Sequence, residues 1–407
     1  MRRGWVHALL GALVLLSFAP AASAQFETAS VVGTVRDTSG AVVPDAKVTL
    51  TNTATGVAIT RTTTGDGSYE FVTVKGGIYL VIAEKAGFSL ALVDNVQVQV
   101  GARLRVDMQL AVGQLTEKVE VMATSPLIET DSSQRGQVIS GDQMRELALN
   151  GREYSALALL STGVRQSALN KSTNGTPREG AFNVNGLRST FNNFLIDGID
   201  NNAYGTSNQG FSNQVMQPPP DAVSEFRVVT NNQSAEYGRA AGATVNVAYR
   251  SGANQPHGDA WEFFRDTKLN ATTFFKPADG QKPPLRRNQY GGVLGGPIVK
   301  NKAFFFGDFE GFRQDKKATA FSTLPTTVQD SGLLSVDIRD PRTGAVYPAG
   351  TPIPMTAFAR KVLGALPAPN VAGAANNYSI AEDFTNDTDK AGGKVDLQVS
   401  PTFSLFG

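Results

Sequence analysis

The sequence predicts a mainly β protein in which a small α+β domain separates two regions with different strand patterns. Apolar and polar residues alternate over short stretches in residues 30–110, and Asn-Gly and Asp-Gly turns with two short helices mark the middle of the chain. The last region alternates aromatic, glycine and polar residues over longer stretches. The composition agrees, because 41 glycines and 20 prolines among 407 residues are typical of many strands joined by turns.

The first residues have the pattern of a secretory signal peptide. Arg2 and Arg3 precede an apolar run at residues 8–16, and the small residues Ala22-Ser23-Ala24 follow it. A membrane anchor needs about 20 apolar residues, and this run is shorter. We therefore expect export, with residues 1–24 forming the signal peptide and cleavage after Ala24.

The composition also excludes several classes of function. The chain has no cysteine, so disulfides and thiolate metal sites are unavailable, and of its two histidines His7 lies in the predicted signal peptide. Its 37 basic residues nearly balance its 36 acidic ones, which argues against a nucleic-acid partner. No histidine cluster or phosphate-binding loop stands out. We therefore expect no enzyme activity, and no catalytic residue, cofactor or metal site.

Residues 25–112 are expected to form a small β-sandwich, because turns containing glycine divide them into short, regularly spaced strands. The segments Gly33 to Asp37, Pro44 to Val48 and Thr64 to Phe71 resemble the carboxypeptidase regulatory-like domain. The resemblance implies a transthyretin-like sandwich, also classed as a carbohydrate-binding-like fold. It favours a structural spacer over a sugar-binding module and implies no catalysis.

Residues 113–135 are polar and weakly patterned, as expected of a linker. Within them, Lys118-Val119-Glu120-Val121-Met122 alternates as a short strand. Such a strand can add to the sheet edge of another protein through main-chain hydrogen bonds, or it can pair within the domain that follows. The residues alone leave both alternatives open.

Residues 136–253 predict an α+β domain. Ser140 and Gln143 form a capping box for a short helix that we expect to end at Gly151, and a second helix is expected at residues 153–160. The sequence predicts strands around Asn183, Leu195, Arg227 and Val245. Asn185-Gly186 and Asp197-Gly198 provide the turns of two hairpins.

Residues 254–407 alternate in the way that membrane-spanning strands do. The clearest strand has Val395, Leu397 and Val399 on one face and Lys394, Asp396, Gln398 and Ser400 on the other. Phe305 and Phe309 likewise lie opposite Asp308 and Glu310. Strands of roughly ten residues with one apolar face are typical of a membrane β-barrel, and a large soluble β-sandwich gives the same alternation. Residues 314–390 are expected to form one long external loop.

In this order, the segments resemble the TonB-dependent outer-membrane receptors, and among them the Oar-like group with its N-terminal regulatory-like sandwich. The motifs that carry the resemblance are Leu195-Ile196-Asp197-Gly198-Ile199, Glu236-Tyr237-Gly238-Arg239 with Gly242, and Asn288-Gln289-Tyr290-Gly291. The resemblance implies that residues 136–253 form the plug, with Asp197, Gly198, Glu236, Tyr237, Gly238, Arg239 and Gly242 as its motif residues. It also implies that Lys118, Val119, Glu120, Val121 and Met122 are the TonB box, and that residues 254–407 begin a transmembrane β-barrel.

The resemblance further implies partners and a location. The partners would be TonB at the inner membrane, outer-membrane lipid, and a large solute, with an oligosaccharide, a peptide and a siderophore as candidates. Asn232-Gln233 and Gly242-Ala243 depart from the pattern of siderophore receptors, and loops at residues 203–217 and after Gln314 are candidate solute contacts. The location would be the outer membrane of a Gram-negative bacterium, with the sandwich in the periplasm.

Some expectations are less specific. Charged residues of the plug could pair with the barrel wall or be ordinary surface charges: Arg188, Asp197, Glu225, Arg227, Glu236 and Arg239. Residues 254–407 supply only a few strands of a barrel that needs roughly 22, so we expect an N-terminal fragment. The alternative function is a secreted or surface β-sandwich protein that binds glycans or acts in adhesion.

Overall fold

The computed structural model describes residues 29–113, 118–122, 131–167, 182–203, 214–238, 241–271, 282–400 and 403–407. The predicted signal peptide with Ala24, and the motif residue Arg239, lie outside the described residues. No helix within the described ranges is long and apolar enough to cross a membrane. The chain divides into two units, one formed by Met1–Trp261, Tyr290–Glu310 and Asp389–Gly407 and the other by Glu262–Gln289 and Gly311–Thr388.

The alternating N-terminal segment forms the predicted β-sandwich. Its strands are β1 (Ala29–Asp37), β2 (Lys47–Asn52), β3 (Ala58–Thr62), β4 (Ser68–Val74), β5 (Gly77–Glu84), β6 (Leu90–Val98), β7 (Arg103–Arg105) and β8 (Met108–Leu110). One sheet has the order β4-β1-β7, with β8 also paired to β1, and the other runs β3-β2-β5-β6. Strands such as β2, β4 and β5 bury alternate apolar residues, because side chains alternate across a pleated strand.

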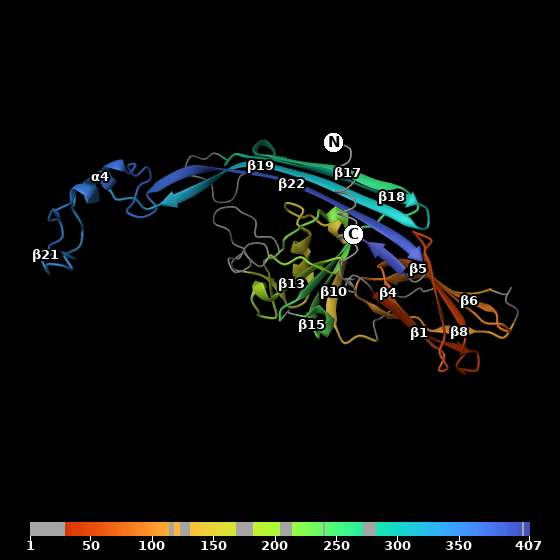
Figure 1. Cartoon of the computed structure of the whole chain (residues 1–407). Helices are drawn as coiled ribbons and strands as arrows, with labels where there is room; N and C mark the ends of the chain where they lie inside the picture. The colour runs from red at the N-terminus through yellow and green to blue at the C-terminus, as the bar shows by residue number, and fades with distance from the viewer. Residues whose placement is uncertain are drawn as a thin grey trace, which may run out of the picture. The chain divides into compact units, whose positions relative to one another are not determined.

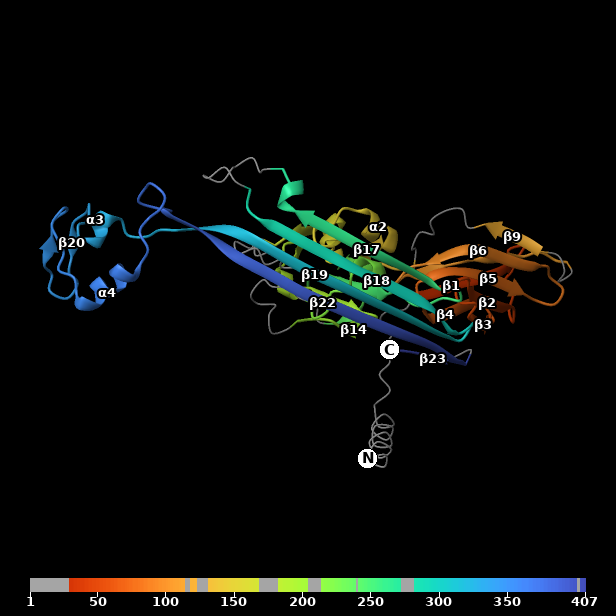
Figure 2. The same ribbon diagram turned by 90° about the horizontal axis from the view of Figure 1, so that it is seen from above.

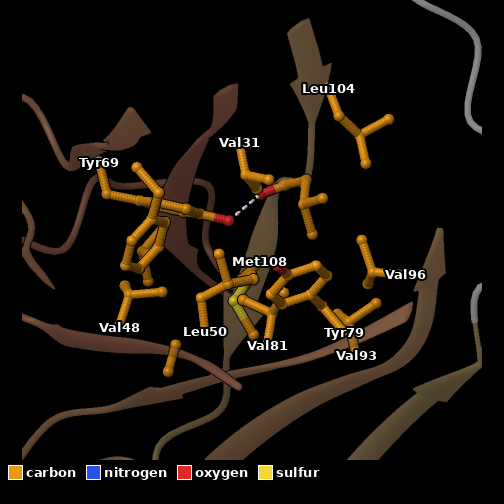
Figure 3. Packing of buried hydrophobic residues seen from close by; sticks show 14 of the residues in the cluster. Val31, Val48, Leu50, Tyr69, Tyr79, Val81, Val93, Val96, Leu104 and Met108 are labelled. Carbon is orange, nitrogen blue, oxygen red and sulfur yellow. Dashed lines mark hydrogen bonds between the residues drawn. The ribbon is translucent and has the colours of Figure 1, made fainter. Parts of the chain in front are cut away.

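The core of the sandwich is closely packed around two aromatic side chains. Tyr69 and Phe71 of β4 stack edge to face with ring centroids 5.8 Å apart, and the Tyr69 hydroxyl donates to the backbone oxygen of Val106 at 2.5 Å. Figure 3 shows Tyr69 among Val48, Leu50 and other apolar side chains of the core. Burial raises the pKa of Tyr69, so its hydroxyl remains a donor. Gly33 lies next to the hydrogen bond between Tyr69 and Val106, and a Cβ atom at this position would collide with the Val106 oxygen.

The strand predicted in the linker exists, and within the described residues it pairs with the sandwich that precedes it. β9 (Lys118–Met122) pairs in parallel with β6 of the sandwich that precedes it. Figure 2 shows β9 beside β6 at the edge of the sheet β3-β2-β5-β6-β9. Of the two alternatives, pairing within the following domain is not what the structure shows, because the edge of β6 offers main-chain groups that the sequence pattern does not reveal. The alternative of adding to the sheet edge of another protein stays a prediction.

The central domain has the predicted α+β character. Its strands are β10 (Arg135–Ser140), β11 (Val164–Gln166), β12 (Phe182–Val184), β13 (Asn193–Ile196), β14 (Ile199–Asp200), β15 (Val223–Asn231) and β16 (Thr244–Tyr249). Its helices are α2 (Gly141–Glu146) and the 3-10 turns η1 (Tyr154–Leu160), η3 (Ser189–Phe191), η5 (Pro220–Ala222) and η6 (Ala235–Tyr237). The main sheet has the order β10-β15-β16-β13-β14, and β11 pairs with β12.

Local signals in the central domain act as predicted, with one exception. Ser140 caps α2 by accepting from the N–H of Gln143, and the Gln143 side chain completes the capping box. Asn185 and Asp197 adopt left-handed φ angles of 51° and 48°, each followed by a glycine, as tight hairpin turns require. However, α2 ends at Glu146 rather than at Gly151, because the chain is already extended at its C-cap.

The C-terminal region forms a sheet of long strands. They are β17 (His257–Asp266), β18 (Leu285–Val299), β19 (Ala303–Ser322), β22 (Tyr378–Ser400) and β23 (Phe403–Phe406), in this order across the sheet, with η7 (Thr267–Leu269) after β17. Figure 1 shows β17, β18, β19 and β22 side by side. β19 and β22 have 20 and 23 residues, more than the roughly 9–11 that cross a bilayer.

The predicted loop at residues 314–390 is shorter than expected. β19 continues to Ser322 and β22 begins at Tyr378. Both strands therefore extend into polar sequence whose pattern predicts a loop. The connection between them contains α3 (Thr327–Asp330), the hairpin of β20 (Ile338–Arg339) and β21 (Val346–Tyr347), and α4 (Ala357–Ala365). Long polar strands are possible here because their backbone groups pair with each other, whatever the side chains.

Candidate functional site

A group of buried charges joins the central domain to the inner face of the long-strand sheet. Arg152, just before η1, forms ion pairs with Asp221 of η5 and with Glu310 of β19, the latter at 3.3 Å. The side chains of Arg152, Asp221 and Glu310 are 11%, 10% and 1% exposed. Burial lowers the pKa of Arg152 and Glu310 opposes this effect, so the guanidinium depends on its carboxylate partners. We call these three residues the Arg152 cluster.

Two further residues surround this cluster. Lys390 of β22 lies 3.7 Å from the second carboxylate oxygen of Glu310, so Glu310 contacts cations from both sides. The Arg152 guanidinium also lies 4.9 Å from the ring centroid of Trp261 on β17, within the range of a cation–π contact. Arg152 therefore fixes the central domain against two strands of the sheet, β17 and β19, while Lys390 holds Glu310 from within the sheet.

A second ion pair links the Asp-Gly hairpin to the same sheet. Asp197 accepts the N–H of Tyr249 at 2.8 Å through one carboxylate oxygen and forms an ion pair with Lys394 of β22 at 2.7 Å through the other. Both side chains are nearly buried, at 10% and 5% exposed. The hairpin turn thus positions Asp197, and β22 brings its partner from a distant part of the sequence.

We expect the Asp197 and Lys394 side chains to be energetically coupled. Asp197→Asn keeps an acceptor for Tyr249 but removes the charge, while Lys394→Met removes the cation and keeps an apolar stem. Each single variant leaves one buried charge without its partner, so the double variant should recover about 1–3 kcal/mol relative to the sum of the singles. Denaturant unfolding in detergent measures this coupling, and additive effects would contradict it.

The sandwich also contacts the central domain through a buried carboxylate. Glu225 of β15 accepts the N–H of Val100, in the turn between β6 and β7. Burial is the main cause that raises the pKa of Glu225 to about 7, while Val100 and Arg227 act in the opposite direction. A Cβ atom at Gly101 would lie 3.1 Å from the Tyr237 hydroxyl, so this turn also lies against the Glu-Tyr-Gly motif.

The other predicted motif residues have mainly structural surroundings. Gly238 follows η6 with a left-handed φ of 51°, and the backbone oxygen of Tyr237 accepts from the Asn193 side chain at 3.1 Å. Gly242 lies against Asn192 with no room for a side chain. Glu236 is exposed. Arg239 lies outside the described residues. Among the motif residues that the structure describes, Asp197 is the one that forms an ion pair with the long-strand sheet.

Of the six charged residues considered as partners of a barrel wall, Asp197 forms such an ion pair. Glu225 contacts the sandwich instead, Arg227 is buried within β15, and Arg188 and Glu236 are exposed. Sequence reasoning missed Arg152 and Asp221. One available signal was the pair Asp308 and Glu310, because carboxylates on one face of an aromatic strand need partners if that face is covered.

The outer face of the long-strand sheet is apolar and exposed. Large side chains with 44–59% exposure alternate with the buried polar positions; they are Leu294 and Ile298 of β18, Phe309 of β19, and Val395 and Val399 of β22. On the opposite face, Gln289, Glu310, Gln314, Lys394 and Asp396 are buried. This arrangement confirms the predicted alternation and is typical of a sheet that faces lipid on one side and a polar interior on the other.

The sequence matches three domain families in succession. The Carboxypeptidase regulatory-like domain matches residues 30–111, the TonB-dependent Receptor Plug Domain matches residues 128–245, and the Outer membrane beta barrel domain matches residues 248–407. The sandwich, the central domain and the long-strand sheet therefore correspond to these three domains.

The chain is also similar in part to individual proteins. The TonB-dependent transporter Oar of Myxococcus xanthus is 26% identical over 311 residues, which cover 72% of this chain and 27% of that protein. The outer membrane transporter YddB from Escherichia coli is 12% identical, with a TM-score of 0.43 over 66% of this chain and 31% of that one. The siderophore receptor PirA from Acinetobacter baumannii is 14% identical, with a TM-score of 0.37 over 67% and 30% of the two chains.

The chain spans about a quarter of the length of the Oar relative. The three domain families follow each other along this chain, and the similarity to the Oar relative covers most of this chain. These matches identify the plug and the outer-membrane barrel region of a TonB-dependent receptor in this chain, behind a carboxypeptidase regulatory-like domain, and show its similarity to Oar.

Proposed function

We propose that this chain belongs to a transporter that takes up a large solute across the outer membrane with energy supplied through TonB. The observation that carries the proposal is the buried Arg152 cluster, which fastens the plug to the polar inner face of the barrel strands. A wide barrel would leak without such a closure. Because the charges are paired and buried, the plug stays in place until work is done on it.

The apolar outer face of the sheet supports a place in the outer membrane rather than the soluble alternative. A secreted glycan-binding or adhesion protein would expose Leu294, Ile298 and Phe309 to water, and large exposed apolar patches are unusual on soluble proteins. The signal peptide at residues 1–24 and a periplasmic sandwich belong to the same proposal. So do the solute candidates: an oligosaccharide, a peptide or a siderophore.

The segment that couples to TonB is proposed to be β9. Recognition of a strand through its main chain requires backbone N–H groups, whereas the side chains at these positions can vary. Val121→Pro removes one N–H, and Val121→Thr keeps it together with a β-branched shape suited to a strand.

We expect Val121→Pro to weaken binding of the purified periplasmic domain of TonB by at least about tenfold, since each tenfold change corresponds to about 1.4 kcal/mol, roughly one main-chain hydrogen bond. The matched variant Val121→Thr should bind within about threefold of the unmodified chain. The measurement is the binding affinity of the TonB domain, titrated onto immobilised outer-membrane vesicles that contain the chain. Equal binding by all three proteins would reject β9 as the coupling segment.

A further inference from the structure

The coupling strand is already part of a folded sheet. β9 pairs in parallel with β6 over five successive residue pairs, from Leu90 with Lys118 to Asp94 with Met122. It ends the five-stranded sheet β3-β2-β5-β6-β9, and within the part of the chain that the structure describes no strand pairs with its other edge. Figure 2 shows β9 in this edge position.

We propose that the sandwich presents residues 118–122 as a preformed edge strand, and that TonB adds its own strand to the outer edge of β9 without displacing β9 from β6. The proposal rests on the function proposed above and assigns the sandwich a role in it. The sandwich would be a scaffold for the docking of TonB rather than a spacer.

The balance of main-chain hydrogen bonds favours addition over displacement. In a strand, successive backbone groups point to opposite edges, so β9 uses one set toward β6 and directs the other set away from it. If TonB displaced β6, each new hydrogen bond would replace one that already exists, and the edge of β6 would become exposed. Addition to the outer edge leaves the bonds between β9 and β6 unbroken and replaces only bonds to water.

Conformational entropy favours the same route. A flexible segment loses backbone freedom when it becomes a strand, and this loss reduces its affinity for a partner. In β9 the loss has already occurred on folding of the sandwich. In addition, β6 leads directly to Val100, whose N–H donates to Glu225 of the central domain. A strand added to β9 is therefore connected to the plug through the sandwich as well as through the linker.

A reversible lock between β6 and β9 tests the proposal. The chain has no cysteine, so the double variant Leu90→Cys and Lys118→Cys can form only the intended disulfide. These residues are register partners on adjacent strands. Paired strands lie about 4.8 Å apart, within the range of Cα separations that a disulfide spans. We expect the oxidised chain, in outer-membrane vesicles, to bind the purified periplasmic domain of TonB as tightly as the reduced chain or up to about tenfold more tightly.

The matched control is the double variant Thr49→Cys and Thr60→Cys, which links the register partners of β2 and β3 away from β9. Its binding should not change on oxidation. A loss of more than about tenfold on oxidation of the β6–β9 lock alone would show that β9 must leave the sheet, and would overturn this inference while the coupling role of β9 stands. Failure of the Leu90 and Lys118 variants to form a disulfide would overturn the pairing. If neither the variant in either redox state nor the unmodified chain binds the TonB domain, the proposed function itself is rejected.

Discussion

Replacing Arg152 by alanine should be among the most damaging single changes in the plug. The variant leaves the carboxylates of Asp221 and Glu310 buried without their shared cation, although Lys390 remains 3.7 Å from Glu310. Removing one partner of a buried ion pair costs about 3–5 kcal/mol. We therefore expect the plug of Arg152→Ala to unfold at much lower denaturant than that of the unmodified chain, as measured by urea-dependent proteolysis in detergent.

The chain offers a matched control for this variant. Arg145 forms an ion pair with Asp142 on the surface of α2, where the two side chains are 33% and 78% exposed. An exposed pair of this kind contributes about 0–1 kcal/mol. Arg145→Ala removes the same kind of side chain from the same domain and should change little. Similar losses for both variants would contradict the role of the Arg152 cluster.

Glu225→Gln should make the contact between sandwich and plug more stable at neutral and alkaline pH. Burial raises the pKa of Glu225 from 4.5 to about 7. A carboxyl with a raised pKa in the folded state stabilises the fold fully below its unfolded pKa, and this contribution is lost as the pH rises toward the folded value. Between pH 4.5 and about 7 the unmodified chain should therefore lose up to about 3 kcal/mol, at about 1.4 kcal/mol per pKa unit.

The glutamine variant keeps an oxygen that can accept the N–H of Val100 and has no charge to bury. It should match the unmodified chain near pH 4 and exceed it in stability near pH 8, as measured by hydrogen exchange of β15 across this range. Glu70→Gln is the control, because Glu70 pairs with Arg103 on the surface of the sandwich with 46% and 45% exposure. The prediction is that the difference in stability between Glu225→Gln and the unmodified chain depends on pH. The same difference at pH 4 and at pH 8 would refute it.

Local features of the structure followed from the sequence where neighbouring residues cause them. The capping box at Ser140 and the left-handed turns at Asn185 and Asp197 depend on residues within one helical turn or one hairpin. Alternation likewise predicted which face of β22 carries Val395 and which carries Lys394. The limits of β19 and β22 were less predictable, because polar side chains do not prevent two backbones from pairing.

The sequence by itself determined the order of sandwich, plug and barrel strands, because strand periodicity and turn residues act over short distances. Only the tertiary structure decided that Arg152 meets Glu310 across 158 positions, that Asp197 meets Lys394, and that β9 joins the sheet of the sandwich. For each of these groups, many charged residues or strand edges elsewhere in the chain could serve as the partner. The sequence pattern around those candidates does not distinguish the true partner from the others. The choice is made when folding brings distant segments together and burial makes an unpaired charge or an unpaired edge costly.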